Sequence, residues 1–166
     1  MNQVGEQVVY GIHGICNIVA QEERTVDRKR VTYLVLEPVG QHGSRYLVPI
    51  HSEAAMGKLR PMLTPDELEA LLRSDRIRQD CWIQDENRRK QTYRELIGSG
   101  DRERLMAMVS TLYRHRAAQA AAGRKCHMCD ENFLRDAERI LTGEFSVVLN
   151  MPPEQVRQYL RSSLEG

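Results

Sequence analysis

One stretch of the chain combines a large aromatic ring with several basic side chains. Trp82 is the only tryptophan, and Arg88, Arg89 and Lys90 follow it within Asp80–Asp101. This combination suits a nucleic-acid contact, because cations hold phosphates while the ring stacks on bases or wedges between them. The polar neighbours of Trp82 favour this interpretation, in which the ring is exposed to a partner. A buried tryptophan near the start of a helix is the alternative, since tryptophan is highly buried on average.

A second candidate is the Cys-x-x-Cys pair formed by Cys126 and Cys129. This spacing is half of a zinc site, but a closed structural site needs four ligands. His127 could be a third ligand, whereas Cys16 and Cys81 would have to come from elsewhere in the fold. A redox role needs the pair after a strand, and this region is predicted to be helical. We therefore assign no cofactor and keep zinc only as a minor alternative.

The amino-acid composition limits the functional classes to which the protein can belong. The 166 residues include 24 Lys and Arg against 23 Asp and Glu, which gives a formal net charge of +1. Any basic surface must therefore come from local segregation of charge. Acidic residues alternate with Arg and Lys, which is typical of solvated helix faces. The chain has no glycine-rich phosphate loop, H-E-x-x-H or G-x-S-x-G motif, so nothing indicates an enzyme.

The N-terminus has no basic segment followed by an apolar run, so we expect no signal peptide. No uninterrupted apolar stretch approaches the roughly 20 residues that a membrane helix needs. We expect a soluble, cytoplasmic protein with no membrane contact.

The first third of the chain has the pattern of short strands. Apolar and β-branched residues occur around Val8 and across Val31–Leu36, and a further strand at Tyr46–Val48 is ended by Pro49. The polar stretch Arg24–Arg30 reads as a hairpin. Short strands joined by tight turns predict a small SH3-like or Tudor-like β-barrel over residues 1–60.

The remainder, residues 61–166, has helical periodicity. Thr64 begins a capping box, and the helix that carries Trp82 near its start is predicted to run to about Ile97. Asp101 and Asp130 are predicted to cap the next two helices, and a last one follows Pro153. The fold class is therefore α+β with two modules, the β-barrel being followed by a compact five-helix bundle.

Several ordered segments together resemble a known family. They are Val4–Tyr10, His13-Gly14, Tyr33–Leu36, Val48-Pro49, Trp82, Arg88-Arg89, Ser99–Asp101 and Arg139–Glu144. In this order they are similar to the CarD/CdnL bacterial transcription regulators, whose N-terminal module also occurs in transcription-repair coupling factors. The resemblance covers most of the chain, and the helical half matches the regulators.

The resemblance implies two partners, RNA polymerase and promoter DNA. In the family, the Tudor-like module docks on the β subunit of RNA polymerase, and the helical domain contacts promoter DNA at the upstream edge of the melted region. The family tryptophan, matching Trp82, wedges into the minor groove beside the −10 element and slows bubble collapse. The basic residues matching Arg88 and Arg89, with Lys90 beside them, would hold phosphates.

Two departures affect the implied sites. An arginine that the family often carries before the Val-Pro of the fourth strand is replaced by Leu47, which precedes Val48-Pro49. Arg45 lies on the same strand face by alternation and is the expected substitute, while Arg24 matches a second polymerase contact. Trp82 also lies about one helical turn further from Ser99–Asp101 than in the family pattern.

Three hypotheses follow. The leading one is a regulator that binds polymerase and stabilises the open promoter complex. The second is a Tudor-like protein-interaction adaptor with no direct DNA role. The third is a zinc or redox sensor built on Cys126 and Cys129. The sequence does not decide between activation and repression, or between monomer and dimer.

Overall fold

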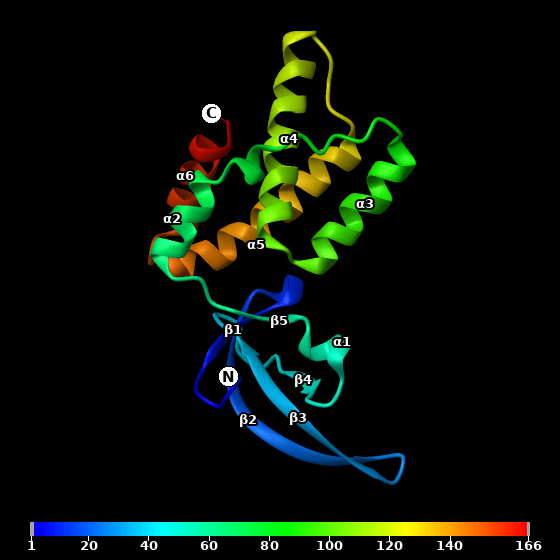
Figure 1. Cartoon of the computed structure of the whole chain (residues 1–166), viewed down its shortest axis with the longest axis vertical. Helices are drawn as coiled ribbons and strands as arrows, with labels where there is room; N and C mark the ends of the chain where they lie inside the picture. The colour runs from blue at the N-terminus through cyan, green and yellow to red at the C-terminus, as the bar shows by residue number, and fades with distance from the viewer. Residues whose placement is uncertain (1, 166) are drawn as a thin grey trace. The chain divides into compact units, whose positions relative to one another are not determined.

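The computed structural model describes residues 2–165, and the chain divides after residue 62 into two compact units. The N-terminal unit is a five-stranded antiparallel sheet, and the second is built of helices, so the fold class is α+β (Figure 1).

The N-terminal sheet has the strand order β4-β3-β2-β1-β5. Its elements are β1 (Gln7–Tyr10), the 3-10 helix η1 (Gly11–His13), β2 (Ile15–Val26), β3 (Lys29–Pro38), β4 (Tyr46–Pro49), α1 (Glu53–Met56) and β5 (Leu59–Pro61). The alternation of Leu34 and Leu36 places both on one face, where they pack with Ile18 and Val48 in a buried cluster.

Strands β2 and β3 continue well beyond this cluster as a long hairpin (Figure 1). Its two-residue turn has both Asp27 and Arg28 at positive φ, 50° and 65°, which matches the twist of the strands that it joins. The predicted charged hairpin at Arg24–Arg30 is therefore present, as the end of a longer ribbon. The three-residue strand β5 was not predicted, because Leu59–Pro61 is too short to show alternation.

The second unit contains α2 (Pro65–Arg73), the 3-10 helix η2 (Asp75–Arg78), α3 (Glu86–Ser99), α4 (Arg102–Ala121), α5 (Met128–Leu149) and α6 (Pro153–Glu165). Helix α4 is its centre, because every residue of Leu105–Tyr113 is buried and the helix contacts η2, α3, α5 and α6. A helix that is covered all round must lie inside its unit.

Two of the predicted helix caps are confirmed. The Thr64 hydroxyl accepts a hydrogen bond from the Glu67 backbone N–H at 3.1 Å, and the Asp101 carboxylate accepts one from the Arg104 N–H at 3.2 Å. The prediction for Asp130 was wrong. Helix α5 begins one turn earlier, with His127 at its N-cap, and Asp130 is buried inside the first turn.

The assignment of acidic residues to solvated faces also needs correction. Glu138 and Glu144 on α5 are buried, as is Asp130. Glu138 bonds to Tyr113 and Arg161, and Glu144 bonds to Arg102. Burial of a carboxylate is tolerated when cations and hydrogen-bond donors satisfy it. The alternation of acidic and basic residues along the chain therefore includes ion pairs in the interior as well as charges at the surface.

Candidate nucleic-acid interface

Trp82 lies in the segment 79–85 that joins η2 to α3, not in a helix. The predicted start of this helix was too early, because the Asp85 carboxylate caps it by accepting from the Asn87 N–H at 3.2 Å. Two bonds hold the tryptophan within the segment. Its backbone N–H donates to Asp80 Oδ1 at 3.0 Å, and its indole Nε1–H donates to Gln84 Oε1 at 3.2 Å.

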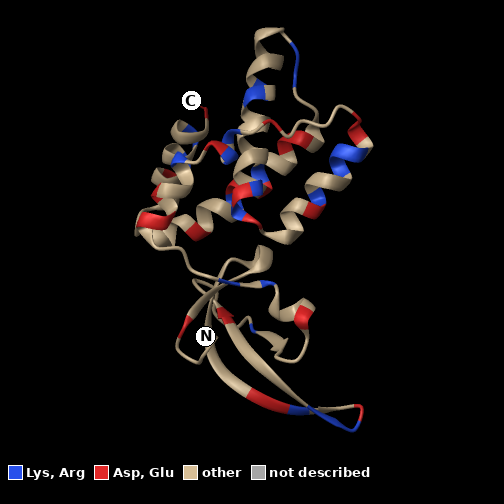
Figure 2. Ribbon diagram, in the orientation of Figure 1, with Lys and Arg blue, Asp and Glu red and all other residues tan. Residues whose placement is uncertain are grey.

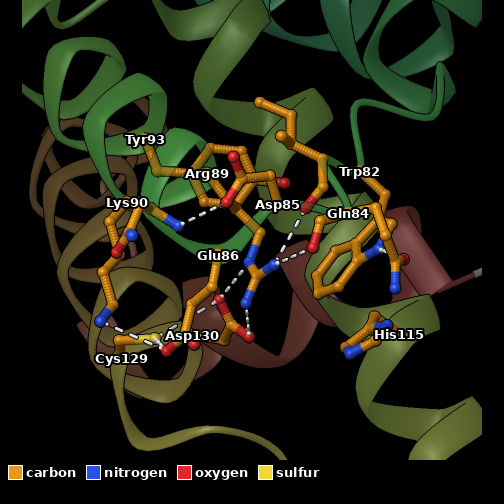
Figure 3. A network of polar contacts seen from close by, with 12 residues as sticks. Trp82, Gln84, Asp85, Glu86, Arg89, Lys90, Tyr93, His115, Cys129 and Asp130 are labelled. Atoms are coloured by element: carbon orange, nitrogen blue, oxygen red, sulfur yellow. Dashed lines mark hydrogen bonds and ion pairs between the residues drawn. The ribbon is translucent and has the colours of Figure 1, made fainter.

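The indole ring is held between two other side chains. The His115 imidazole of α4 stacks on it with the ring centroids 3.6 Å apart and the planes 19° apart. The Arg89 guanidinium of α3 lies 4.3 Å from the ring centroid, and Figure 3 shows it on the side of the indole away from His115. Trp82 is half-buried, so it combines both interpretations of the sequence: it packs on the helices and keeps part of the ring exposed.

Arg89 is one of the most buried side chains of the protein, with only 2% of it exposed. It makes a two-pronged ion pair with Asp130, Nε to Oδ1 at 2.8 Å and Nη2 to Oδ2 at 3.1 Å. Its Nη1 donates to the backbone carbonyl of Ile83 at 2.9 Å. Arg89 thus ties α3, α5 and the tryptophan segment together.

This position changes the role expected for Arg89. Burial alone would lower the pKa of the guanidinium, but its hydrogen bond and charge interaction with Asp130 hold that pKa above the usual value. The group therefore stays charged while its donors face inward. Because it does not reach the surface, Arg89 acts here as a support for Trp82, in place of the predicted phosphate contact.

Arg88 and Lys90 remain at the surface of α3. Arg88 is exposed, and Lys90 Nζ lies 3.2 Å from Glu86 Oε1 one turn earlier. The hydrogen bond from Lys90, followed by its charge, lowers the pKa of the Glu86 carboxyl. Figure 2 shows the basic run at the beginning of α3 directly after the acidic residues that open the helix. The Arg88 cation is thus accessible at the surface. The Lys90 cation is accessible to a partner only if its ion pair with Glu86 opens.

His115 was not anticipated as part of this site. Burial lowers the pKa of its imidazole, and the positive charge of nearby Arg89 adds to the effect while Asp130 opposes it. The neutral form of the imidazole is therefore favoured in the stack on Trp82. Its contact partner lies more than thirty positions away in the chain, so no local pattern marks it.

The four residues predicted to contact polymerase lie in the N-terminal unit, three of them in strands of its sheet. Cross-strand register places Arg24 opposite Val31, Pro49 opposite Tyr33 and Leu47 opposite Val35. Since paired residues share a face and alternate residues do too, Arg24, Leu47 and Pro49 lie on the face opposite Leu34 and Leu36.

Arg45 reaches the same face by a different route. It precedes β4, and its Nε pairs with Glu37 Oε1 at 3.0 Å. Glu37 is two residues beyond Val35 on β3 and therefore belongs to the face that carries Leu47. Arg24 is likewise paired, with Glu22 at 3.1 Å, and both arginines are more than half exposed.

The cysteine pair lies at the beginning of α5, beside carboxylates of α3 and α5. Cys129 Sγ lies 3.8 Å from Glu86 Oε1 and 3.9 Å from Asp130 Oδ1, and both Cys126 and Cys129 are free thiols. Burial raises the pKa of the Cys126 thiol, which disfavours the thiolate that binds metal. Within residues 2–165, no group of three or more His, Cys, Asp or Glu side chains is arranged to hold a metal ion.

Two family models match this chain. The CarD-like/TRCF RID domain family matches residues 3–61, and the family described as the C-terminal domain of CarD matches residues 68–161. A search of curated proteins found no match. None of the helices in residues 2–165 is both long and apolar enough to cross a membrane.

Proposed function

The chain belongs to the CarD-like family of RNA polymerase-interacting transcription regulators, and we propose that it binds the β subunit and stabilises the open promoter complex. In this proposal residues 1–60 are the Tudor-like docking module, and residues 61–166 contact DNA at the upstream edge of the bubble, near the −10 element. The protein would work in the cytoplasm, where it meets polymerase.

The observation that carries the proposal is the fixation of Trp82. Its ring is stacked on His115 and contacted by Arg89, and Asp130 anchors that arginine with two hydrogen bonds. A ring held in this way has little rotational freedom left to lose on binding, which favours the bound state. With a neighbour on each side, the indole offers its edge, a shape that suits insertion at a base step more than stacking on a base.

A rigid wedge discriminates between closed and open DNA. Separating stacked bases costs a few kcal/mol per step, whereas a junction that is already splayed presents the gap. The wedge therefore binds the open state more tightly than the closed state, and the equilibrium shifts by that difference in affinity. Slower collapse of the bubble is the expected consequence.

Arg88 and Lys90 provide the phosphate contacts in this proposal, and Arg89 supports the wedge from within. Two cations give weak affinity for free DNA, in keeping with the formal net charge of +1. Docking on polymerase would compensate, because a tethered domain meets the promoter at a high effective concentration.

The sheet face that carries Arg24, Arg45, Leu47 and Pro49 is the proposed docking surface. It presents two exposed cations beside partly exposed Leu47 and Pro49. Charged groups at the edge of such a surface steer association and set specificity, while the apolar residues supply the area to be buried.

The alternative is a protein-interaction adaptor with no DNA role, and one experiment separates the two. Binding of the chain to its RNA polymerase is measured first, and the lifetime of open promoter complexes is then measured with and without it. Polymerase binding together with a longer lifetime supports the regulator. Polymerase binding with an unchanged lifetime supports the adaptor, and no polymerase binding contradicts both.

A further inference from the structure

The helical unit contains a cavity of about 400 Å³ bounded by α4, α5 and α6. Five arginines line it: Arg116, Arg135, Arg139, Arg157 and Arg161. Glu131 and Glu138 are the acidic residues of the lining, so the formal excess is three positive charges in one small space. Like charges so close together repel each other, and an anion in the cavity would relieve that repulsion.

Four of the arginines form two rows. Arg135 and Arg139 are one turn apart on α5, and Arg157 and Arg161 are one turn apart on α6. Side chains four residues apart lie on the same helix face. Helices α5 and α6 contact each other, and both rows line the same cavity, so each row can bind one end of a shared ligand.

Three of these five arginines form no ion pair with the residues that the structure describes. Arg157 pairs with Glu154 at 2.9 Å, and Arg161 pairs with Glu138 at 3.4 Å. For Arg116, Arg135 and Arg139, no carboxylate among residues 2–165 lies within the 4.0 Å of an ion pair.

The acidic residue at the base of the cavity is already engaged. Glu138 is buried and accepts hydrogen bonds from the Tyr113 hydroxyl and from Nε and Nη2 of Arg161, the latter two at 3.4 Å. The bond to Glu138 raises the pKa of Arg161. The Arg116 guanidinium lies 5.4 Å from the centroid of the Tyr113 ring. Glu138 thus contacts Arg161, and Tyr113 contacts Arg116, so two of the arginines that line the cavity are held by buried side chains.

We propose that this cavity binds a small anion that carries two or more linked phosphates. The planar guanidinium presents paired donors that match phosphate oxygens, so several arginines around one space favour a polyphosphate over a single carboxylate. The volume lies within the ~300–1,000 Å³ typical of small-molecule sites. A DNA backbone is convex and meets projecting cations, whereas these cations line a hollow. The site does not depend on the proposed polymerase role.

Titration calorimetry of the full chain in low salt without divalent ions tests the site. The probes are inorganic pyrophosphate, adenosine diphosphate and adenosine. The variant carries Arg135→Gln and Arg139→Gln, both at exposed positions. The matched control carries Arg94→Gln and Arg124→Gln, which are exposed arginines outside the cavity.

We expect pyrophosphate and adenosine diphosphate to bind and adenosine not to bind. The cavity variant should weaken pyrophosphate binding at least tenfold, and the control by less than twofold. If adenosine diphosphate binds more tightly than pyrophosphate, the ligand is a nucleotide. If the two bind with equal affinity, the ligand is an inorganic polyphosphate. Absence of pyrophosphate binding would overturn the proposal, as would equal loss in both variants.

Discussion

Arg89 on α3 and Asp130 on α5, separated by 41 positions in the chain, form a buried ion pair with hydrogen bonds of 2.8 and 3.1 Å. The same guanidinium lies 4.3 Å from the centroid of the Trp82 ring. An interior pair therefore holds the one residue that the account places in DNA. We therefore expect the stability of the helical unit and the position of the Trp82 ring to depend on the same contact.

Asp130→Asn should lower the free energy of unfolding by about 3–5 kcal/mol, because removing one partner of a buried pair leaves an uncompensated charge. Asp136→Asn is the matched control on the same helix, at a half-buried position with no ion pair among the described residues. Urea unfolding followed by circular dichroism measures both. Equal, small losses in the two variants would contradict the structural role of the Arg89–Asp130 pair.

His115 should make stability depend on pH. Its pKa is lowered in the folded state, so the unfolded chain binds more protons between the folded value and the usual 6.5. Its contribution is fully present above about 6.5 and is lost as pH falls through the folded pKa. Wild type should therefore lose more stability than His115→Phe, which keeps the stack on Trp82, between pH 8 and pH 5. Parallel losses would contradict this.

Arg24→Glu should weaken binding to RNA polymerase by about tenfold or more, because it places a like charge against the proposed acceptor surface. Arg30→Glu is the control. Arg30 pairs with Thr25 and so faces the other side of the same hairpin. Neither change should unfold the sheet, since exposed ion pairs contribute about 0–1 kcal/mol. Interferometry with immobilised polymerase measures both, and equal effects would reject the assigned face.

Arg88→Ala should reduce the salt dependence of binding to the polymerase–promoter complex. Each phosphate contact contributes a slope of roughly −0.9 in log affinity against log salt, so the slope should become shallower by about one. Arg73→Ala, at an exposed position of α2, should leave the slope unchanged. A slope that is the same for Arg88→Ala and wild type would remove Arg88 from the DNA contact.

The sequence predicted the features that depend on neighbouring residues. The caps at Thr64 and Asp101 were found because a cap and its backbone donor lie within three positions. The run of apolar and β-branched residues across Val31–Leu36 likewise predicted a strand, which the structure has as the middle of β3.

Features that depend on distant pairs were not predicted. Arg89 and Asp130 each look like ordinary surface charges in sequence, and only their meeting inside the unit makes burial tolerable. The stack of Trp82 on His115 arises in the same way, from two segments brought together by helix packing. These long-range pairs are why Arg89, predicted from sequence as a surface phosphate contact, is buried beside Trp82.

The lifetime of open promoter complexes, measured with wild type, Trp82→Ala and Tyr159→Ala, tests the central claim most directly. Tyr159 is an aromatic residue of α6 with 42% of its surface exposed, which makes it a control for loss of an exposed ring. Polymerase binding by all three proteins is verified beforehand. The account predicts a several-fold longer lifetime with wild type and Tyr159→Ala, and a lifetime near that of polymerase alone with Trp82→Ala. Full activity of Trp82→Ala would contradict the account.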